Sequence, residues 1–479
     1  MIWRFSERIL AQGIAVSVSI ILARILMPDD YGLIAMVMVF IAIANVFVVS
    51  GFGNALIQKK DADSIDFSSV FFFNIAFSIF LYIVLFLMSP YIAEYYSMPT
   101  LSPVLKVLGL TVVISGVTSV QYAFVSKNML FRRLFWSTLF GTLFSGVLGL
   151  ILAYHGFGVW ALVVQSLSSS LINTMVLWFT ISWRPTRSFS FLRLKGLFLF
   201  GWKMLFEGLS VTIFGKITNL VIGKVYTSSD LGYFTKAQQF PQLLVSNITT
   251  SMSSVLFPAM AMRQDDRAQV TALLRKSVVL SSYVIFPMLT GLAIVAKPFV
   301  VLLLTEKWIQ TVPYLQIFCY TNAATVGMIS RHQALNAIGR SDVFMNEHLV
   351  SRITGIILLL LFYRISVMAI ALIGIASSLI LTLTVMYTSR RYNNYRYRAQ
   401  IADVLPTMIL CVCMGVPVYF IQYMDLSIFF ILIVQVVSGA AIYMGLSGIL
   451  KPNGYRETLP YIIRAVEKIR SGHGNNIIS

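Results

Sequence analysis

The stretch LARILMPDDYGL (22–33) decides the fold, because a similar stretch, IGKVYTSSDLGY (222–233), follows at an offset of 200 residues. Three pairs of chemically similar residues align in the two stretches: Arg24 with Lys224, Asp30 with Asp230, and Gly32 with Gly232. Each stretch has the pattern of a helix end, an acidic turn and the beginning of the next helix. The two stretches therefore predict that one structural unit occurs twice in the chain.

Two further pairs of segments support this repeat. SPYIAEYYSMPTLSPVLKVL (89–108) resembles AKPFVVLLLTEKWIQTVPYLQI (296–317), and VWALVVQSLSSSLI (159–172) resembles MAIALIGIASSLIL (368–381). The three matches occur in the same order, and the repeated unit holds six apolar runs. Because six is an even number, both copies have the same orientation across a membrane, and they are related by an axis along the membrane normal. Paired bundles of this kind favour a transporter that rocks its halves over a static scaffold.

The composition places the chain in a membrane. Of its 479 residues, 58% are hydrophobic and only 11% are charged, and the mean hydropathy is +0.83. A soluble protein of this length could not cover its surface with so few charges, whereas a helix that faces lipid needs no polar coat. Three cysteines and four histidines are scattered without the spacing of metal ligands. We therefore expect an all-α, polytopic membrane protein that holds no metal ion and no cofactor.

Windows of about twenty apolar residues predict fourteen transmembrane helices. Their ranges are 8–27, 31–57, 67–89, 103–126, 134–154, 158–183, 199–225, 237–260, 277–296, 311–331, 346–363, 367–389, 404–423 and 427–449. The repeat groups them into four regions: an N-terminal six-helix bundle (1–190), a C-terminal six-helix bundle (191–395), a further helix pair (396–450) and a tail (451–479). In the tail, ETLPYIIRAVEKIR (457–470) predicts an amphipathic helix that lies on the membrane surface.

The distribution of basic residues gives the orientation. Of the 36 lysines and arginines, 26 fall in the N-terminal segment, in every second loop and in the C-terminal tail, and only four fall in the opposite loops. Basic residues accumulate on the cytosolic side of membrane proteins. Both termini are therefore predicted to be cytosolic. This asymmetry also explains the net charge of +18, so nucleic-acid binding is not needed to account for it.

The predicted spans contain six basic residues and a single acid, Glu207, well inside a helix. Lys106 and Lys203 lie near helix ends, where their side chains can reach the headgroups, and Glu207 lies one turn from Lys203. A charge inside the membrane is costly and is retained for a reason. We therefore assign a cationic cleft that binds an anionic, phosphate-bearing substrate to four residues: Arg24, Lys216, Lys224 and Arg352.

Polar residues in the first two helices of each half can also line this cleft and hydrogen-bond to sugars. These residues are Gln12, Asn45, Asn54, Asn219, Gln238, Gln239 and Asn247. Hydrogen bonding between helices is an equally good interpretation of the same residues. Glu207 is the one candidate for proton coupling, and pairing with Lys203 is its alternative.

Motifs of enzymatic chemistry are missing from the sequence. It holds no glycine-rich phosphate loop and no set of residues that would form a nucleophile with its base. A membrane glycan polymerase or glycosyltransferase, the alternative of a different class, needs a sizeable outer loop with acids or arginines, and none is predicted here. The sequence thus favours a transporter over an enzyme.

Five stretches resemble the polysaccharide transporter family of Wzx-type flippases, within the multidrug/oligosaccharidyl-lipid/polysaccharide exporter superfamily. They are LARILMPDDYGLIAM (22–36), GFGNALIQKKD (51–61), SPYIAEYYSMPTLSPVLKVL (89–108), HGFGVWALV (155–163) and SDLGYFTKAQQFPQLLVSNITTSMSSVLFPAMA (229–261).

The resemblance implies fourteen helices in two V-shaped bundles. It also implies transport of an oligosaccharide on undecaprenyl diphosphate across the inner membrane of a bacterium, with O-antigen, exopolysaccharide or capsule repeat units as the glycan. A glycan polymerase and a chain-length regulator of the same pathway are the implied partners. The arginine of the family's ARI motif matches Arg24, whereas the acids that multidrug members carry in their first helix are missing here. A peptidoglycan-precursor flippase is the alternative that shares this mechanism.

Overall fold

Long apolar runs become helices, because only a helix satisfies all its backbone hydrogen bonds within one segment of a membrane. The computed structural model describes residues 2–460, with the side chains of 11–53, 55–199, 201–340 and 342–460, and this part contains helices and no strand. Its internal contacts divide the chain into two compact units, Met1–Thr235 and Lys236–Ser479. The predicted all-α polytopic fold is confirmed.

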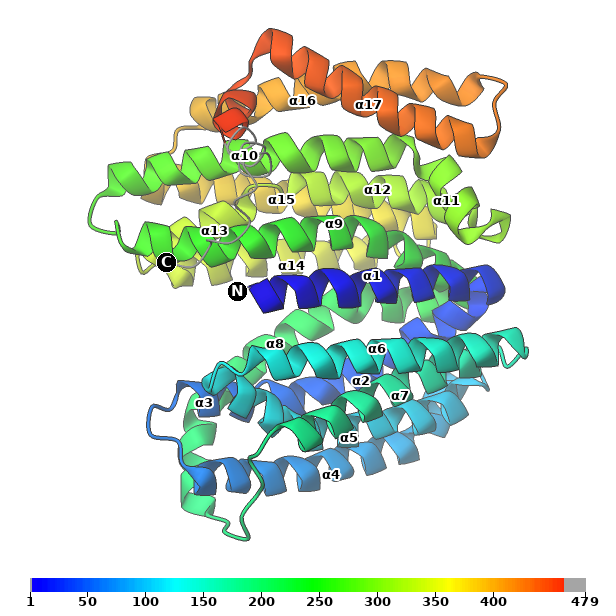
Figure 1. The fold of residues 1–479 in the computed structure, drawn as a ribbon, viewed down its shortest axis with the longest axis vertical. Helices are drawn as coiled ribbons and strands as arrows, with labels where there is room; N and C mark the ends of the chain where they lie inside the picture. Colours follow the sequence, from blue (N-terminus) through cyan, green and yellow to red (C-terminus); the bar gives the residue numbers. More distant parts are fainter. Residues whose placement is uncertain (1, 461–479) are drawn as a thin grey trace, which may run out of the picture. The chain divides into compact units, whose positions relative to one another are not determined.

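The first unit contains eight helices and the beginning of a ninth (Figure 1). They are α1 (Ile2–Ile25), α2 (Pro28–Val49), α3 (Phe52–Gln58), α4 (Ser64–Tyr96), α5 (Leu101–Lys127), α6 (Phe131–Tyr154), α7 (Val159–Thr180), α8 (Phe191–Val225) and the first residues of α9 (Ser228–Ala261). The helix α6 packs between α1 and α7, and α4 packs along α5. The helix α2 contacts both α5 and α8, so it lies at the centre of this unit.

The second unit continues α9 and adds the remaining helices (Figure 1). They are α10 (Arg267–Ile294), α11 (Ala296–Leu304), a 3₁₀ turn (Glu306–Trp308), α12 (Thr311–Ala324), α13 (Met328–Ala337), α14 (Ser341–Phe362), α15 (Val367–Asn393), α16 (Tyr397–Phe420), a 3₁₀ turn (Ile421–Tyr423) and α17 (Ile428–Leu450). The helix α10 packs against α12 and α16, and α14 packs along α15. The terminal pair α16 and α17 joins this unit through α10 and α11.

Twelve helices in the described residues are long and apolar enough to cross a membrane, so the predicted count of fourteen is not confirmed. The two predicted spans outside this set are 8–27 and 311–331. In the first, only the shorter apolar segment Ala11–Ile25 is found. The second is interrupted between α12 and α13, where Gly327 adopts a φ of +83° that ends the helical path. Apolar character continues through this break, and hydropathy therefore missed it.

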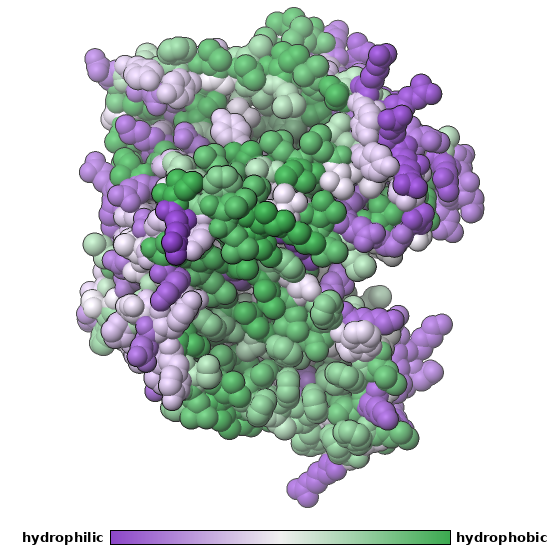
Figure 2. Space-filling view, turned by 180° about the vertical axis from the view of Figure 1, so that it is seen from behind, coloured by the Kyte–Doolittle hydropathy of each residue, from purple (hydrophilic) through white to green (hydrophobic). Residues whose placement is uncertain are grey.

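The surface agrees with insertion in a bilayer. Apolar side chains cover the middle of the helices, and hydrophilic side chains gather near the helix ends (Figure 2). Large apolar residues inside the spans, such as Leu383 and Val412, are 65% and 64% exposed. Such exposure would be unfavourable in water, but lipid tails solvate these side chains. The chain is therefore a multi-pass membrane protein.

Glycines let α8 approach α2 closely. A Cβ atom added at Gly201 would lie 2.5 Å from the carbonyl oxygen of Gly51, and one added at Gly223 would lie 2.5 Å from the side chain of Met36. Gly208, between these two, meets Ser50 at 3.1 Å. The two helices therefore run antiparallel along a row of small residues, which is how helices pack where no hydrophobic force drives their association. The contact with Gly201 falls where α2 ends and α3 begins, so the predicted span 31–57 is divided there.

The two repeated stretches contact each other directly. A Cβ atom added at Gly32 would lie 1.7 Å from the carbonyl oxygen of Ser228, and one added at Gly232 would lie 2.1 Å from that of Pro28. The hydroxyl of Ser228 also donates to a carboxylate oxygen of Asp29, at 2.6 Å. The first turns of α2 and α9 thus cross backbone against backbone, and only glycine fits at both positions of this crossing.

The order of the elements repeats along the chain. Helix α1 corresponds to α8, α2 and α3 to α9, α4 to α10 and α11, and α5 to α12 and α13, while α6 and α7 correspond to α14 and α15. The corresponding helices α4 and α10 begin in the same way, because the carboxylates of Asp63 and Asp266 each accept two backbone N–H groups of the first turn. The predicted domain boundaries at 190, 395 and 450 follow this repeat and stay a prediction. The structure describes the predicted tail helix (457–470) only up to residue 460, and the rest of this helix lies outside the described residues.

Replacement of Gly32 by alanine should weaken the fold, because its methyl group has no room beside the backbone of Ser228. Overpacking of this kind costs about 1–3 kcal/mol. We expect Gly32→Ala to lower the Tm of the purified protein by several degrees. Gly445→Ala in α17 is the matched control, since nothing lies within 4 Å of the added atom. An unchanged Tm for Gly32→Ala would contradict the backbone-to-backbone crossing.

Candidate functional site: basic residues and an apolar groove

Arg24 and Lys224 lie in equivalent places of the first unit. Each is in the last turn of its helix, α1 or α8, four residues before the carbonyl group that contacts a glycine of the crossing. Both side chains are exposed. Arg24 and Lys224, which the sequence repeat predicts to be equivalent, thus both lie near the glycine crossing.

The side chain of Lys224 is held by the end of α4. Its ammonium group donates a hydrogen bond to the backbone carbonyl of Tyr95 and lies 4.1 Å from the centroid of the Tyr95 ring. A cation over an aromatic face is attracted by the negative charge of that face. Sequence reasoning did not identify Tyr95, although it belongs to the stretch EYYSMP (94–99) that the family resemblance includes.

Lys216 lies half-buried on α8 and, among the described residues, has no hydrogen-bond or ionic partner. The contacts of Gly201 with Gly51 and of Gly223 with Met36 bracket it along the seam between α8 and α2. The same two helices also carry two of the polar residues predicted to line the cleft, Asn45 on α2 and Asn219 on α8. Asn219 is 6% exposed, and the amide oxygen of Asn45 is buried with no hydrogen-bond partner in the described part of the chain.

The remaining predicted site residues are more scattered. Gln12 is half-buried on α1, and the side chain of Asn54 lies outside the described side chains. Arg352, Gln239, Gln238 and Asn247 belong to the second unit, where Arg352 and Gln239 are half-buried and the other two are exposed. A cleft that joins these residues to Arg24 and Lys216 stays a prediction.

Glu207 and Lys203 do not form an ion pair in the described structure, although they lie one turn apart on α8. Both side chains are exposed on the first unit. The alternative interpretation of Glu207 as a structural partner of Lys203 therefore has no contact to support it. Within the described residues, no group of three histidines, cysteines, aspartates or glutamates is placed to hold a metal ion.

Several basic residues of the predicted cytosolic side bind acids at helix ends. The ammonium group of Lys59 lies 2.6 Å from a carboxylate oxygen of the buried Asp66, and the guanidinium group of Arg193 binds Asp63. In the second unit, Arg275 donates two hydrogen bonds to Asp403, at 2.8 and 2.9 Å. The pairs of Arg193 with Asp63 and of Arg275 with Asp403 join segments far apart in the sequence, so part of the positive charge stabilises the bundles.

Asp63 is stabilised in its charged form by its hydrogen-bond donors. The N–H groups of Asp66 and Ile65 and the guanidinium group of Arg193 lower the pKa of Asp63 from 3.8 to about 2. A carboxylate whose pKa is lower in the folded than in the unfolded state stabilises the fold above the unfolded pKa, and this contribution is lost as the pH falls through the folded pKa.

Asp63→Asn should therefore destabilise the protein in a pH-dependent way. We expect the variant to have a lower Tm than the parent at all pH values above about 4, with the difference shrinking between about pH 4 and pH 2. Thermal unfolding of the purified chain across this range measures it. Asp61→Asn, an exposed residue two positions away, is the control. A difference in Tm that stays constant down to pH 2 would exclude the electrostatic explanation.

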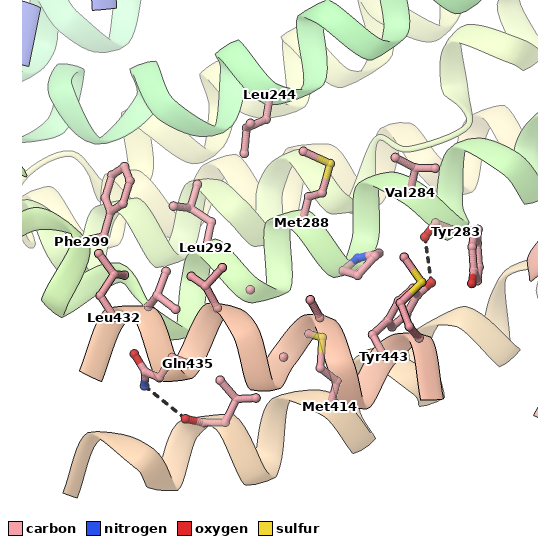
Figure 3. Close-up of a pocket in the computed structure, with 18 of the residues that line it drawn as sticks. Leu244, Tyr283, Val284, Met288, Leu292, Phe299, Met414, Leu432, Gln435 and Tyr443 are labelled. Carbon is pink, nitrogen blue, oxygen red and sulfur yellow. Dashed lines mark hydrogen bonds between the residues drawn. The ribbon is translucent and has the colours of Figure 1, made fainter. Parts of the chain in front are cut away.

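An apolar groove with a volume of about 750 Å³ lies within the second unit (Figure 3). It runs between α10 and α17, with one residue each from α9 and α11 and two from α16. Its lining is almost entirely apolar and includes Leu244, Val284, Met288, Leu292, Phe299 and Met414. Small residues, Gly291 on α10 with Gly439 and Ala440 on α17, leave the space open.

Two of the polar groups in the groove bind to the backbone. The amide nitrogen of Gln435 donates to the carbonyl oxygen of Val418 at 3.1 Å, and the hydroxyl of Tyr443 donates to that of Tyr283 at 2.7 Å (Figure 3). The hydroxyl of Tyr283 and the amide oxygen of Gln435 have no hydrogen-bond partner in the described residues. Because the rest of the lining is almost entirely apolar, the groove suits a hydrocarbon chain. Sequence reasoning missed this groove, because a helix side that lines it has the same composition as one that faces lipid.

The chain is similar to known proteins over much of its length. The model of a family described as "polysaccharide biosynthesis protein" matches residues 21–313. The succinoglycan biosynthesis transport protein ExoT of Rhizobium meliloti (strain 1021) is 24% identical over 67% of this chain and 65% of its own length. The lipopolysaccharide biosynthesis protein WzxC of Escherichia coli (strain K12) is 24% identical over 66% and 65%, and the teichuronic acid biosynthesis protein TuaB of Bacillus subtilis (strain 168) is 27% identical over 63% and 62%. The aligned part thus spans slightly less than two thirds of these relatives.

Two solved structures share the fold. The lipid II flippase MurJ in an inward closed conformation aligns with 96% of this chain and 99% of its own, with a TM-score of 0.72 and 16% identity. An inward-facing multidrug resistance transporter of the MATE family, in the MOP superfamily, covers 85% and 94%, with a TM-score of 0.58 and 15% identity. At this level of identity the likeness concerns the fold.

Proposed function

Because this chain belongs to the polysaccharide biosynthesis protein family, we propose that it carries a lipid-linked oligosaccharide from the cytosolic to the periplasmic leaflet of a bacterial inner membrane. The match of the family model to more than half of the chain is the observation that carries this proposal. The names of the relatives, which cite transport and the biosynthesis of succinoglycan, lipopolysaccharide and teichuronic acid, support a glycan as the cargo. The glycan polymerase and chain-length regulator of such a pathway are the proposed partners.

A substrate of this class has an anionic diphosphate between its sugar and its lipid. Lys216 is suited to this group, because it is a half-buried ammonium without a protein partner in the described residues. Buried polar groups need partners, and the amide oxygen of Asn45 on the same seam also lacks one. Arg24 at the end of α1 adds a guanidinium group, which binds phosphate through two parallel hydrogen bonds. The seam between α2 and α8 thus offers a positive site with hydrogen-bonding groups beside it.

The lipid part of the substrate needs an apolar path. The groove between α10 and α17 provides one, because its walls are almost entirely aliphatic and aromatic side chains. When a polyprenyl chain enters the groove, its contacts with lipid tails are replaced by contacts with apolar side chains, so little apolar contact is lost. The headgroup then moves through the protein while the chain stays in an apolar environment.

Transport by alternating access fits a chain built from two copies of one unit. No covalent chemistry is needed, because translocation leaves the substrate unchanged. A membrane glycan polymerase is a poorer interpretation, since the relatives carry transport and biosynthesis names and the connections predicted to face the periplasm, such as those between α1 and α2 and between α8 and α9, are short. A peptidoglycan-precursor flippase would use the same groups, and the likeness to the lipid II flippase concerns the fold alone.

Lys216→Ala should reduce surface glycan in the native host by at least about tenfold, since a hydrogen bond to a charged group contributes about 1.5–3 kcal/mol. Lys216→Arg, which keeps the charge, should retain most of the delivery. Lys195→Ala is the matched control, because this exposed lysine lies on the same helix near its beginning. Immunoblots of surface glycan and of the protein measure delivery and expression. Normal glycan in both Lys216→Ala and Arg24→Ala would rule out the positive site.

Ala440→Trp should reduce delivery by filling the groove. Loss of room for about two methylene groups costs about 1.6 kcal/mol, which corresponds to about tenfold. Gly445→Trp is the matched control on the same helix, since it adds the same side chain where nothing lies within 4 Å. Equal delivery by the two variants at equal expression would show that the groove does not hold the lipid chain.

A further inference from the structure

A buried polar cluster lies in the second unit, at the beginning of α14. The carboxylate of Glu347 lies with one oxygen 3.0 Å from Nε2 of His332 on α13, and its other oxygen accepts a hydrogen bond from the hydroxyl of Thr388 on α15. His332 is 7% exposed and Glu347 is 1% exposed. Three helices therefore contribute one side chain each to a cluster that is closed to solvent.

Ionisable groups from every neighbouring element surround this pair. Arg331, the residue before His332, is 4% exposed and interacts electrostatically with Glu347, and its Nε has no hydrogen-bond partner in the described residues. On α14, the ring of His348 lies 5.2 Å from that of His332, and Arg352 is an electrostatic neighbour of His348. The other nearby groups form a network with Arg331: Tyr395 after α15, Asp403 on α16 and Arg275 on α10.

We propose that His332 and Glu347 form a proton-binding site whose occupancy couples to the transport cycle. This deepens the transport function proposed above and rests on it for the coupling alone. A buried carboxylate and imidazole that share one hydrogen bond, 3.0 Å long here, can hold one additional proton between them. With neutral His332 as the donor to the Glu347 carboxylate, the added proton converts the imidazole to imidazolium.

Charge balance explains why the site takes a proton and not a metal ion. The charges of the Glu347 carboxylate and the Arg331 guanidinium cancel, so these two residues together with a neutral His332 carry no net charge. One added proton leaves one buried positive charge, and the neighbouring carboxylate partly offsets the desolvation cost of this charge. A divalent cation would leave a larger charge beside Arg331, and the described residues provide no third acidic, histidine or cysteine ligand.

The local backbone suggests how the proton is exchanged. The short helix α13 carries Arg331 and His332 and is flanked by two glycines of positive φ, Gly327 at +83° and Gly339 at +76°. Glycines of positive φ thus end the helical path on both sides of α13, and seven of its ten residues are buried, so exchange of the proton requires a local movement of this helix. When α13 moves away from Glu347, water reaches the imidazolium and stabilises it. Proton uptake therefore favours the open arrangement, and proton release favours the closed one described here.

Infrared difference spectra of the purified full-length protein between pH 8 and pH 5 test the site directly. We expect absorption changes of a buried carboxyl and an imidazole that depend on each other. Glu347→Gln, which keeps the size of the side chain and a hydrogen-bond acceptor, should remove the carboxyl change and alter the imidazole change. Glu94→Gln, at an exposed acid of α4, should alter neither. The Tm of each variant shows whether it is folded.

The outcomes separate the site from the transport function. A spectrum of Glu347→Gln identical to that of the parent overturns the site, as does a carboxyl change that disappears in Glu207→Gln instead. A lost spectral change with undiminished glycan delivery overturns the coupling but leaves the site. We expect a lost spectral change together with a loss of delivery of about tenfold, within the usual range of coupling energies. Because the spectra need no substrate, they stand even if the cargo is not a lipid-linked glycan.

Discussion

The backbone contact between Gly32 and Gly232 is the constraint on which the first unit depends. It places the ends of α1 and α8, with Arg24 and Lys224, on one crossing. From this crossing α8 runs along α2 on a row of small residues down to Gly201. In a bilayer, apolar side chains gain little by leaving lipid, so such close approach and buried polar contacts must hold the helices together.

Much of the fold could be predicted from the sequence, because the signals for a membrane helix and for a repeat are local. The equivalence of Arg24 and Lys224 was predicted from aligned residues, and in the structure both residues lie in the last turn of a helix beside the crossing. The breaks after α2 and α12 could not be predicted from hydropathy, since apolar residues continue through both. Gly51 and Gly327 can be read from the sequence, but neither break can. The break at Gly51 depends on its contact with Gly201, 150 residues away, and the break at Gly327 depends on a backbone angle.

The candidate site was predicted only in part, for a related reason. Lys216 stood out because a lysine in the middle of an apolar helix is unusual. The cluster of His332 and Glu347 did not, because the two residues fall at the ends of the predicted spans 311–331 and 346–363, where a polar residue is ordinary. Their separation by 15 residues across a turn hides a contact of 3.0 Å. The apolar groove was hidden in the opposite way, since its lining does not differ in composition from a surface that faces lipid.

The placement of the crossing has a consequence for biosynthesis. Gly232 belongs to the second copy of the repeated unit, yet its contacts lie within the first compact unit, which extends to Thr235. A nascent chain that has inserted only its first six or seven helices still lacks α8, the helix that covers one side of α2. The ribosome must therefore deliver part of the second copy before the first can finish packing. Duplication of an ancestral half-length chain would have replaced a contact between two separate molecules with one made during the synthesis of a single chain.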